Sequence, residues 1–460
     1  MKTKIYIKCV LVISILVTYG CGSQGSKNDL STNKKNVVFI IADDLNKTLG
    51  TYGHPIVKTP NIDKLASLGI QFENAHCNYA VCNPSRTSFL TGIRPENLGI
   101  LDNRTALQSV LGDRQTLPML FKNNGYHTVN IGKIFHSRKE SFNDMKAWDE
   151  LHQFKSTAIG EQGEGRNITD GALKWCNWKA TEGGDEDQKD GQNAAKAVEF
   201  IKSAHDEPFF LAVGFHKPHD PFHAPKKYFD LYPMEDCNPP EMPIDWQPAY
   251  NHSLPTQYPV FAKFTDQDKR EFLRSYYACV SFMDAQVGKV ITALEETKQL
   301  DNTLIVFISD HGYHLGEHNW WNKVTLYENG TSAPFIVMDP SIKQKGYKTG
   351  AMIEFIDIYP TLASLCDLKG IPNYLEGESF EKVLVNPELP MRSEVRSVIR
   401  RGKMLGKSVK NEKWRYISWG EGKQGHELYH QVSDRAEYNN LAEDPRYADE
   451  VKVMQGLLAN

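Results

Sequence analysis

The segment Cys82-Asn-Pro-Ser-Arg86 combines a thiol, a proline and a cation within five positions. Proline suits the first position of a helix, so Pro84 predicts that residue 82 sits just before a helix N-terminus. Free backbone N–H groups and the helix dipole favour an anion at such an end. Arg86 lies one turn further along and can reach the same anion. The pattern indicates an anion site beside a reactive side chain, although a lone cysteine can also be a buried, inert thiol.

Two acidic segments offer oxygen ligands for a hard cation. Asp43-Asp44 follows the apolar run 37–41, and Asp310-His311 follows the apolar run 304–308. Carboxylate oxygens suit Ca²⁺, whereas the imidazole of His311 is a softer ligand than that ion prefers. An Asp-Asp pair at a strand end is by itself more typical of a solvated turn or a helix cap. The convergence of several motifs is what favours a metal site.

Basic and imidazole side chains complete the candidate set. They follow two further apolar runs and the Asp310 segment: Lys133 and His136 after 128–131, His216 and His219 after 209–213, and Lys323. Together with Arg86, the two lysines would place three cations around one anion with concentrated oxygen charge, such as a sulfate ester. The histidines can move protons at the same place. His216 is expected to support the site rather than to react.

All four apolar runs resemble strands that are buried in a parallel sheet. The carboxyl ends of parallel strands meet at one edge, where open α/β sheets bind ligands. Segments with apolar residues at helical spacing lie between and after the runs, at 62–68, 192–204, 268–298 and 355–365. We therefore expect a doubly wound α/β domain that gathers the motifs at one sheet edge.

The longer string from Cys82 to Arg94 resembles the signature of type I sulfatases, in which the cysteine is oxidised after translation to formylglycine. The resemblance implies an alkaline-phosphatase-like α/β sandwich, with a large, mostly parallel central sheet flanked by helices and a smaller C-terminal α+β subdomain. It implies one Ca²⁺ per site, held by Asp43, Asp44, residue 82, Asp310 and His311. It assigns catalysis to residue 82 as the nucleophile and to Arg86, Lys133, His136, His219 and Lys323.

The same resemblance implies a covalent-sulfate mechanism. Hydrated formylglycine at position 82 would attack sulfur with help from Asp44 and the metal. His219, with Lys323 near the bridging oxygen, would protonate the departing sugar oxygen. His136 would then remove the proton of the second hydroxyl, so that sulfate leaves by elimination rather than by attack of water.

Within the family, the segments 212–219 and 310–318 look most similar to iduronate-2-sulfatases and their bacterial relatives. That subgroup includes enzymes acting on glycosaminoglycans and on algal polysaccharides such as ulvan. The implied partners are a sulfated oligo- or polysaccharide and a formylglycine-generating maturation enzyme. A uronic acid would need a second basic contact, for which His223, Lys226, Lys227 and the segment Lys413 to Arg415 are candidates; the alternative is that these are solvated surface charges.

Three other interpretations stay open. A phosphonate or phosphodiester hydrolase shares the fold and can share the formylglycine motif. A surface lipoprotein that binds glycans without catalysis would release no sulfate. A zinc peptidase could use His311, His314, Glu317 and His318, although their spacing is not that of the H-E-x-x-H motif.

Length and composition fit an enzyme of this size. The 460 residues favour several domains or one large domain with an appendage, and we expect a catalytic domain over 36–375 and an α+β subdomain over 376–460. The 53 Lys+Arg against 57 Asp+Glu leave a net charge of -4, so nothing in the charge suggests a general nucleic-acid binder, and we expect no nucleic-acid partner. Cysteines after Cys21 are scattered, which argues against a structural zinc site or a disulfide framework.

The first 21 residues have a composition of their own. Three lysines flank the start of an apolar run over 9–17, which is too short for a spanning helix and has the form of a signal peptide. Gly20-Cys21 resembles a bacterial lipoprotein cleavage box, which implies a lipidated Cys21 and a flexible tether over 22–35. Ordinary signal cleavage with release into the periplasm is the alternative. We expect export to the periplasm or the bacterial outer surface, with the N-terminal lipid as the membrane link.

Overall fold

The computed structural model describes Met1 and residues 34–459, except the side chain of Tyr258. The predicted signal peptide after Met1, its Cys21 and the tether up to residue 33 lie outside the described residues, so their processing stays a prediction. Among the described helices, none combines the length and the apolar character needed to cross a membrane.

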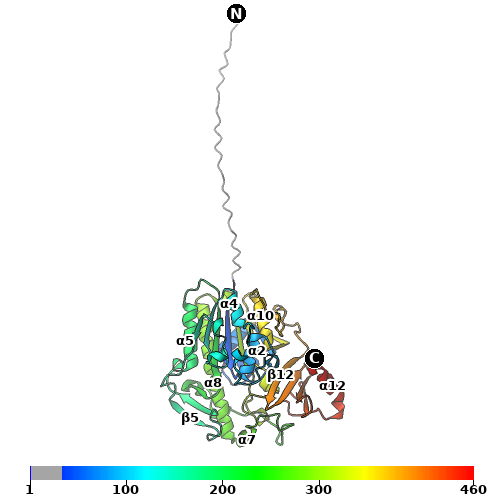
Figure 1. Ribbon diagram of the computed structural model, residues 1–460. Coiled ribbons are helices and arrows are strands. Elements are labelled where there is room, and N and C mark those ends of the chain that lie inside the picture. The colour runs from blue at the N-terminus through cyan, green and yellow to red at the C-terminus, as the bar shows by residue number, and fades with distance from the viewer. Residues whose placement is uncertain (2–33, 460) are drawn as a thin grey trace. The chain divides into compact units, whose positions relative to one another are not determined.

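An eight-stranded sheet forms the centre of the unit Lys35–Asn460 (Figure 1). Its strands, in spatial order, are β11 (Tyr347–Glu354), β2 (Ile70–His76), β10 (Phe335–Met338), β9 (Thr303–Ser309), β1 (Asn36–Asp43), β7 (Phe209–Pro218), β3 (His127–Gly132) and β4 (Glu150–His152). Neighbours pair in parallel except β10, which is antiparallel to both β9 and β2. The four predicted strands are adjacent in the order β9-β1-β7-β3. The predicted mostly parallel sheet is confirmed.

Alternate residues of β1 enter two hydrophobic cores, because successive side chains of a strand point to opposite faces. Val38 and Ile40 belong to the core that contains α1 (Pro60–Leu68), α5 (Lys189–Lys202) and α8 (Asp266–Glu296). Val37 and Phe39 belong to the core that contains α2 (Cys82–Thr91), α4 (Leu117–Asn123) and α10 (Ile358–Leu365). Helices therefore cover both faces of the sheet, as a doubly wound domain requires.

Short elements connect these layers. The remaining helices of four or five residues are α3 (Pro95–Leu98), α6 (Lys226–Phe229), α7 (Tyr258–Phe261), α9 (Glu328–Thr331) and α11 (Glu381–Val385). A small sheet that the sequence did not predict contains β5 (Gly163–Asn167), β6 (Asn177–Thr181) and β8 (Phe222–Pro225).

The start of α2 differs from the expectation. The helix begins at Cys82 itself, with Val81 as N-cap, and the Ser85 N–H donates to the Val81 carbonyl at 3.0 Å. Pro84 is the third helical residue, where a backbone N–H would still lack an acceptor within the helix. The proline marks the first turn rather than its first position, so the expectation that residue 82 precedes the helix is wrong.

A separate four-stranded antiparallel sheet confirms the C-terminal α+β part (Figure 1). It contains β12 (Val395–Arg401), β13 (Met404–Lys410), β14 (Trp414–Trp419) and β15 (His426–His430), and α12 (Ala448–Ala459) packs on it. The shared core includes Val409, Tyr416, Leu428 and Met454. The boundary expected between residues 375 and 376 stays a prediction.

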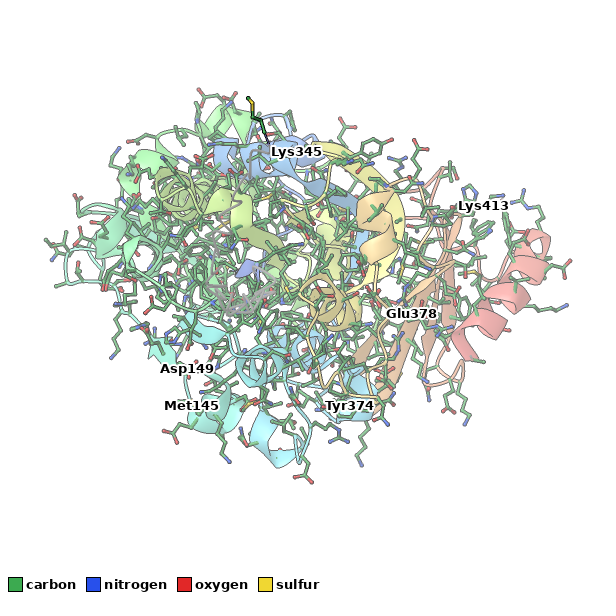
Figure 2. The ribbon with its side chains drawn as sticks, turned by 90° about the horizontal axis from the view of Figure 1, so that it is seen from above. Met145, Asp149, Lys345, Tyr374, Glu378 and Lys413 are labelled. Carbon is green, nitrogen blue, oxygen red and sulfur yellow. The ribbon has the colours of Figure 1, made fainter. Side chains whose placement is uncertain are left out.

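Arg415 of β14 ties this sheet to the central domain. Its guanidinium lies 2.5 Å from a carboxylate oxygen of Glu328 and 2.5 Å from one of Glu437, and only 2% of the residue is exposed. The expectation that Arg415 contacts the sugar is wrong, because these buried ion pairs already engage it. Lys413 is exposed and lies toward the outer end of the C-terminal sheet (Figure 2).

Replacing Arg415 by Met should lower the free energy of unfolding by about 3–5 kcal/mol, since the buried Glu437 carboxylate loses its ion-pair partner and the half-buried Glu328 keeps only Lys410. Denaturant unfolding measures the change. Arg446 pairs with Asp444 on the surface, where 79% of the arginine side chain is exposed, so Arg446→Met should leave stability nearly unchanged. Similar losses in both variants would contradict the buried tie.

Candidate active site

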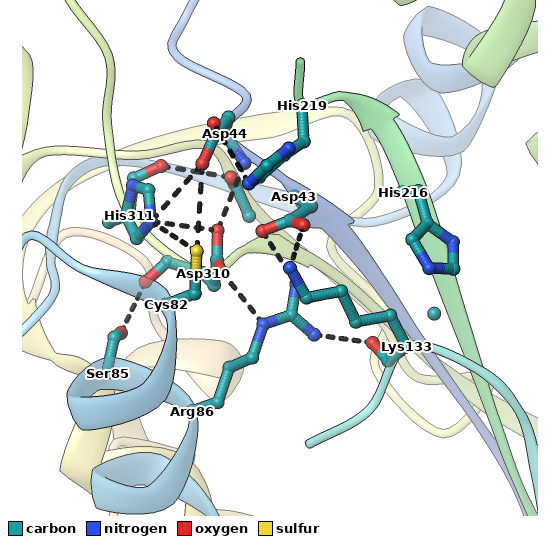
Figure 3. A network of polar contacts seen from close by, with 12 residues as sticks. Asp43, Asp44, Cys82, Ser85, Arg86, Lys133, His216, His219, Asp310 and His311 are labelled. Carbon is teal, nitrogen blue, oxygen red and sulfur yellow. Dashed lines mark hydrogen bonds and ion pairs between the residues drawn. The ribbon is translucent and has the colours of Figure 1, made fainter. Parts of the chain in front are cut away.

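The carboxyl ends of β1, β3, β7 and β9 bring the predicted residues together beside the start of α2 (Figure 3). The side chains that converge there through hydrogen bonds and ion pairs are Asp43, Asp44, Cys82, Arg86, Lys133, His219, Asp310, His311 and Lys323. They come from six segments of the chain, four of which lie at the ends of β1, β3, β7 and β9, and the sheet is what makes these four strand ends coincide.

Cys82 lies at the centre of this group. Its Sγ is 3.1 Å from Lys323 Nζ, 3.4 Å from His311 Nε2 and 3.9 Å from Asp44 Oδ1. The residue has no exposed surface. Burial, together with the charge of Asp43, raises the pKa of the Cys82 thiol well above its usual range. The unmodified side chain is therefore a neutral thiol and a poor nucleophile.

Arg86 joins three strand ends to α2. Its Nε donates to Asp310 Oδ2 at 2.8 Å, and its Nη2 lies 3.3 Å from Asp43 Oδ1. Its Nη1 donates to the carbonyl oxygens of Lys133 and, at 3.0 Å, of Ile134. This fully buried guanidinium fixes the helix against β1, β3 and β9 with charge-assisted hydrogen bonds.

Three buried carboxylates form an oxygen cluster next to Cys82. Asp43, Asp44 and Asp310 have no exposed surface, and the Asp44 N–H donates to Asp310 Oδ1 at 3.1 Å. Asp43 Oδ1 and Asp44 Oδ2 receive no hydrogen bond from the described residues. Ligand atoms of Asp43, Cys82, Asp310 and His311 lie within 4.8 Å of one another. Buried carboxylate oxygens without hydrogen bonds, at this spacing, fit a divalent cation that prefers oxygen.

The two neighbouring aspartates differ electrostatically. Burial favours the neutral acid at both, but Lys133 and the other cations hold the pKa of Asp43 well below its usual range. At Asp44 burial prevails over the attraction of Lys323, and its pKa is raised. Asp44 also has a left-handed backbone with φ of 66°, a conformation uncommon for residues other than glycine. This turn aims the two successive carboxylates at one site.

Two histidines flank the cluster. His219 Nδ1 donates to the Asp220 carbonyl at 2.6 Å, which leaves Nε2 facing Asp44, 3.8 Å from Oδ2. His136 has a buried Nδ1 that makes no hydrogen bond to the described residues. Burial, helped by Lys133, lowers the pKa of His136 to about 3, and burial also lowers the pKa of His219 well below its usual value. Both rings are neutral here and can accept a proton.

The geometry does not support the zinc-peptidase interpretation. His314 Nε2 lies 2.7 Å from Thr325 Oγ1, and His318 Nε2 donates to the Glu437 carbonyl at 3.1 Å. Glu317 accepts from the Leu315 N–H at 2.8 Å. Two groups of side chains among the described residues could hold a metal ion, and neither includes His314, Glu317 or His318.

The candidate sugar contacts after His219 are engaged locally. His223 Nε2 lies 2.8 Å from Asn177 Oδ1. Lys226 and Lys227, with 62% and 60% of their side chains exposed, pair with Asp230 and Asp185 respectively. Their contact with a substrate stays a prediction.

Three further residues that the sequence did not single out support the site. Ser85 Oγ donates to the carbonyl of Asp310, and Asp190 binds the end of β7. Asp220 Oδ1 lies 3.6 Å from His219 Nδ1, and burial raises the pKa of Asp220 to about 7. Ser85 lies within a segment that the sequence already singled out and Asp220 directly follows one, but the motifs gave them no role of their own, and Asp190 stands outside every motif.

Comparisons with known proteins show the family of this chain. A family model described as Sulfatase matches residues 35–368, and one described as N-sulphoglucosamine sulphohydrolase, C-terminal, matches residues 316–460. The chain belongs to the sulfatase family. This sulfatase is 32% identical to human iduronate 2-sulfatase over 79% of its own length and 75% of that protein. It is also 32% identical to a sulfatase of Formosa agariphila, covering 93% of this chain and 86% of the relative.

Solved structures agree with the fold. One protein, in complex with its substrate D-glucosamine-2-N,6-O-disulfate, superposes with a TM-score of 0.75 at 22% identity, over 93% of this chain and 97% of that one. The phosphonate monoester hydrolase of Agrobacterium radiobacter has a TM-score of 0.77 at 20% identity, over 93% and 95%. The expected family and alkaline-phosphatase-like fold are confirmed. Phosphonate hydrolysis and sulfate ester hydrolysis both occur on this fold, so the fold alone does not separate them. The family model and the 32% identity to sulfatases assign this chain to the sulfatases.

The carboxylate cluster predicts that a bound divalent cation stabilises the sulfatase. Chelation should lower the melting temperature and Ca²⁺ should restore it, because ligand at about 100 times its Kd contributes about 2.7 kcal/mol. Asp310→Asn should abolish most of this response in scanning calorimetry. Asp284→Asn, at a buried carboxylate that binds the start of α1, should retain it. An unchanged melting temperature of the demonstrably metal-free protein would contradict the metal site.

Proposed function

We propose that this sulfatase hydrolyses sulfate esters of a uronic-acid-containing glycan through a sulfated residue 82, with Cys82 first converted to formylglycine. The observation that carries the proposal is the environment of position 82. Lys323 and His311 contact its Sγ directly, and three buried carboxylates adjoin it. This arrangement suits an oxygen nucleophile and an anionic substrate, and it disfavours a thiolate.

The charges of the site explain how a sulfate ester could bind. Lys133 now pairs with Asp43, and Lys323 pairs with Asp44. A Ca²⁺ held by Asp43, Asp44, Asp310, His311 and residue 82 would supply the charge that balances the carboxylates and polarises the sulfate. The two lysines could then donate to sulfate oxygens, and Arg86 would keep the carboxylates in place.

The residue at position 82 must act twice. A hydrated aldehyde supplies one hydroxyl to attack sulfur and a second hydroxyl whose deprotonation expels sulfate. Lys323 is placed to donate to an oxygen on residue 82 or on the ester, since its Nζ is 3.1 Å from the present Sγ. A single hydroxyl or thiol at this position would stop at the covalent stage.

Two histidines provide separate proton transfers in this proposal. His219 presents Nε2 toward Asp44 because Nδ1 is held by the Asp220 carbonyl. The negative charge of an arriving ester favours its protonated form, which can then protonate the departing sugar oxygen. His136 has a buried nitrogen without a hydrogen bond to the described residues, and its low pKa keeps the ring unprotonated, so a nitrogen is available to receive the second proton.

The substrate class follows from relatives rather than from the site. Identity to iduronate 2-sulfatase, and 28% identity to an ulvan-active sulfatase of Formosa agariphila, support a sulfated uronic acid of a glycosaminoglycan or an algal polysaccharide. The N-terminal pattern supports export with a lipid on Cys21, which would place the enzyme in the periplasm or on the outer surface. A maturation enzyme for Cys82 is the second partner that the proposal requires.

Cys82→Ala should lower sulfate release by at least about a thousandfold, because a covalent nucleophile is lost while one small side chain changes. Circular dichroism should remain native, and peptide mass spectrometry of the wild type should show an aldehyde or its hydrate at position 82. Cys237→Ala, at a buried cysteine outside the site, serves as the control and should keep its activity. Retention of more than about a hundredth of wild-type activity by Cys82→Ala would refute the role of Cys82.

Substrate choice can be tested with a panel measured as kcat/KM. We expect 2-O-sulfated uronate disaccharides or ulvan oligosaccharides to exceed 6-O-sulfated glucosamine by at least about a hundredfold, a difference of a few kcal/mol in transition-state binding. NMR of the products identifies the carbon that loses sulfate. Faster turnover of a phosphonate monoester than of any sulfate ester would instead assign the chain to the other chemistry of this fold.

A further inference from the structure

Asp190 is a completely buried carboxylate that the proposed mechanism leaves without a role. Asp190 lies in the first turn of α5, and its carboxylate oxygens face the end of β7. The backbone N–H of His216 lies 2.8 Å from Oδ2, and that of Lys217 also lies 2.8 Å from Oδ2. The His216 ring donates from Nδ1 to Oδ1 at 3.1 Å. A single side chain thus holds two successive backbone amides and one ring.

The held segment leads directly to His219. Figure 3 shows His216 and His219 at the end of the same strand, with His219 directed at Asp44. Lys217 is 5% exposed, and its Nζ donates to the carbonyl oxygen of His219 at 3.1 Å. The His219 N–H donates to the Asp43 carbonyl at 3.0 Å. The backbone of His219 is therefore fixed from one side by β1 and from the other by the segment that Asp190 binds.

The same helical turn also supports the strand that carries Lys133. Asn193 Nδ2 lies 3.2 Å from Asp190 Oδ1 and 3.4 Å from the carbonyl of Gly214. The Lys133 N–H donates to that same carbonyl at 2.9 Å. A Cβ at Gly214 would lie 2.0 Å from the carbonyl oxygen of Lys133, so the two strand ends approach as closely as backbone allows. The first turn of α5 thus adjoins both strand ends.

The carboxylate is held in its charged form. Burial alone would raise the pKa of Asp190, but the hydrogen bonds from His216 together with the positive charge of Lys189 outweigh burial and keep it below its usual value. A charged acceptor makes stronger hydrogen bonds to backbone amides than a neutral one. Displacement by as little as an ångström from a change outside the reacting atoms can cost about a hundredfold in rate.

We infer that Asp190 is a positioning residue for leaving-group protonation, because it fixes the strand end that aims His219 at the ester oxygen. The inference rests on the proposed role of His219. It makes a specific demand on the kinetics: loss of Asp190 should matter most when the departing oxygen needs a proton.

The test uses the full-length, matured enzyme and a series of aryl sulfates of similar size, from 4-nitrophenyl to 4-methoxyphenyl. For Asp190→Ala we expect kcat/KM to fall by less than about threefold on 4-nitrophenyl sulfate, whose phenolate leaves readily, and by about 10–100-fold on 4-methoxyphenyl sulfate. The loss should appear in kcat. Asp190→Asn keeps the shape and one acceptor, so it should fold normally and show the same trend at smaller amplitude.

A double-mutant cycle separates positioning from general stability. In a His219→Ala background, Asp190→Ala should cost no more than about a further twofold, because the group that it positions is gone. Asp185→Ala is the matched control: Asp185 also accepts several hydrogen bonds near the start of α5, from Tyr228 and Gln286, but contacts neither His216 nor Lys217. It should affect all aryl sulfates equally.

Each outcome assigns the failure to one hypothesis. The inference would be overturned if Asp190→Asn lowered kcat/KM equally on all aryl sulfates. It would also be overturned if Asp190→Ala lowered kcat/KM by the same factor with and without His219. Either result would leave the proposed function intact. If His219→Ala itself showed no dependence on the leaving group, the proposed acid would be wrong and the inference would fall with it.

Discussion

The active site depends on one constraint: its buried charges must be balanced by opposite charges of other buried side chains. Three carboxylates and the guanidinium of Arg86 have no exposed side-chain surface, and Lys133 and Lys323 keep only 10% of theirs. Buried charges are costly unless each has a partner at hydrogen-bond distance. That requirement explains why the partners come from neighbouring strand ends: a parallel sheet can deliver opposite charges to one edge from distant parts of the chain. The reactive residue is placed where these charges meet.

Buried charges also hold the molecule together away from the reacting atoms. Asp190 binds the backbone at the end of β7, and Arg415 joins Glu328 to Glu437 between the central domain and the C-terminal sheet. Hydrophobic packing sets the layers, but it tolerates small shifts of one element along another. Directional ionic hydrogen bonds at a few junctions restrict those shifts, and a site that needs sub-ångström placement benefits from them.

Most of the site could be predicted because its residues stand at fixed spacing around strong strand signals. The predicted strands and the long helix correspond to β1, β3, β7, β9 and α8, each marked by a long apolar pattern. β10 is an apolar run of only four residues, and β2 and β11 mix polar with apolar residues, so these strands, including the sheet's antiparallel member, went unpredicted. Contacts of single residues were the hardest to foresee: Arg415 was misassigned to the sugar because its charge was visible and its burial was not, and Asp190 had no motif around it.

The burial of Cys82 also sets an order of events in biosynthesis. Every residue of α2 is buried, and the thiol is enclosed by Lys323, His311 and Asp44. An oxidising enzyme needs an exposed sulfur and free space beside it. The folded chain offers neither, so on the proposed chemistry the conversion belongs to the interval between synthesis and the packing of α2. Substitutions that accelerate this packing would reduce the converted fraction of molecules while leaving every atom of the finished site in place.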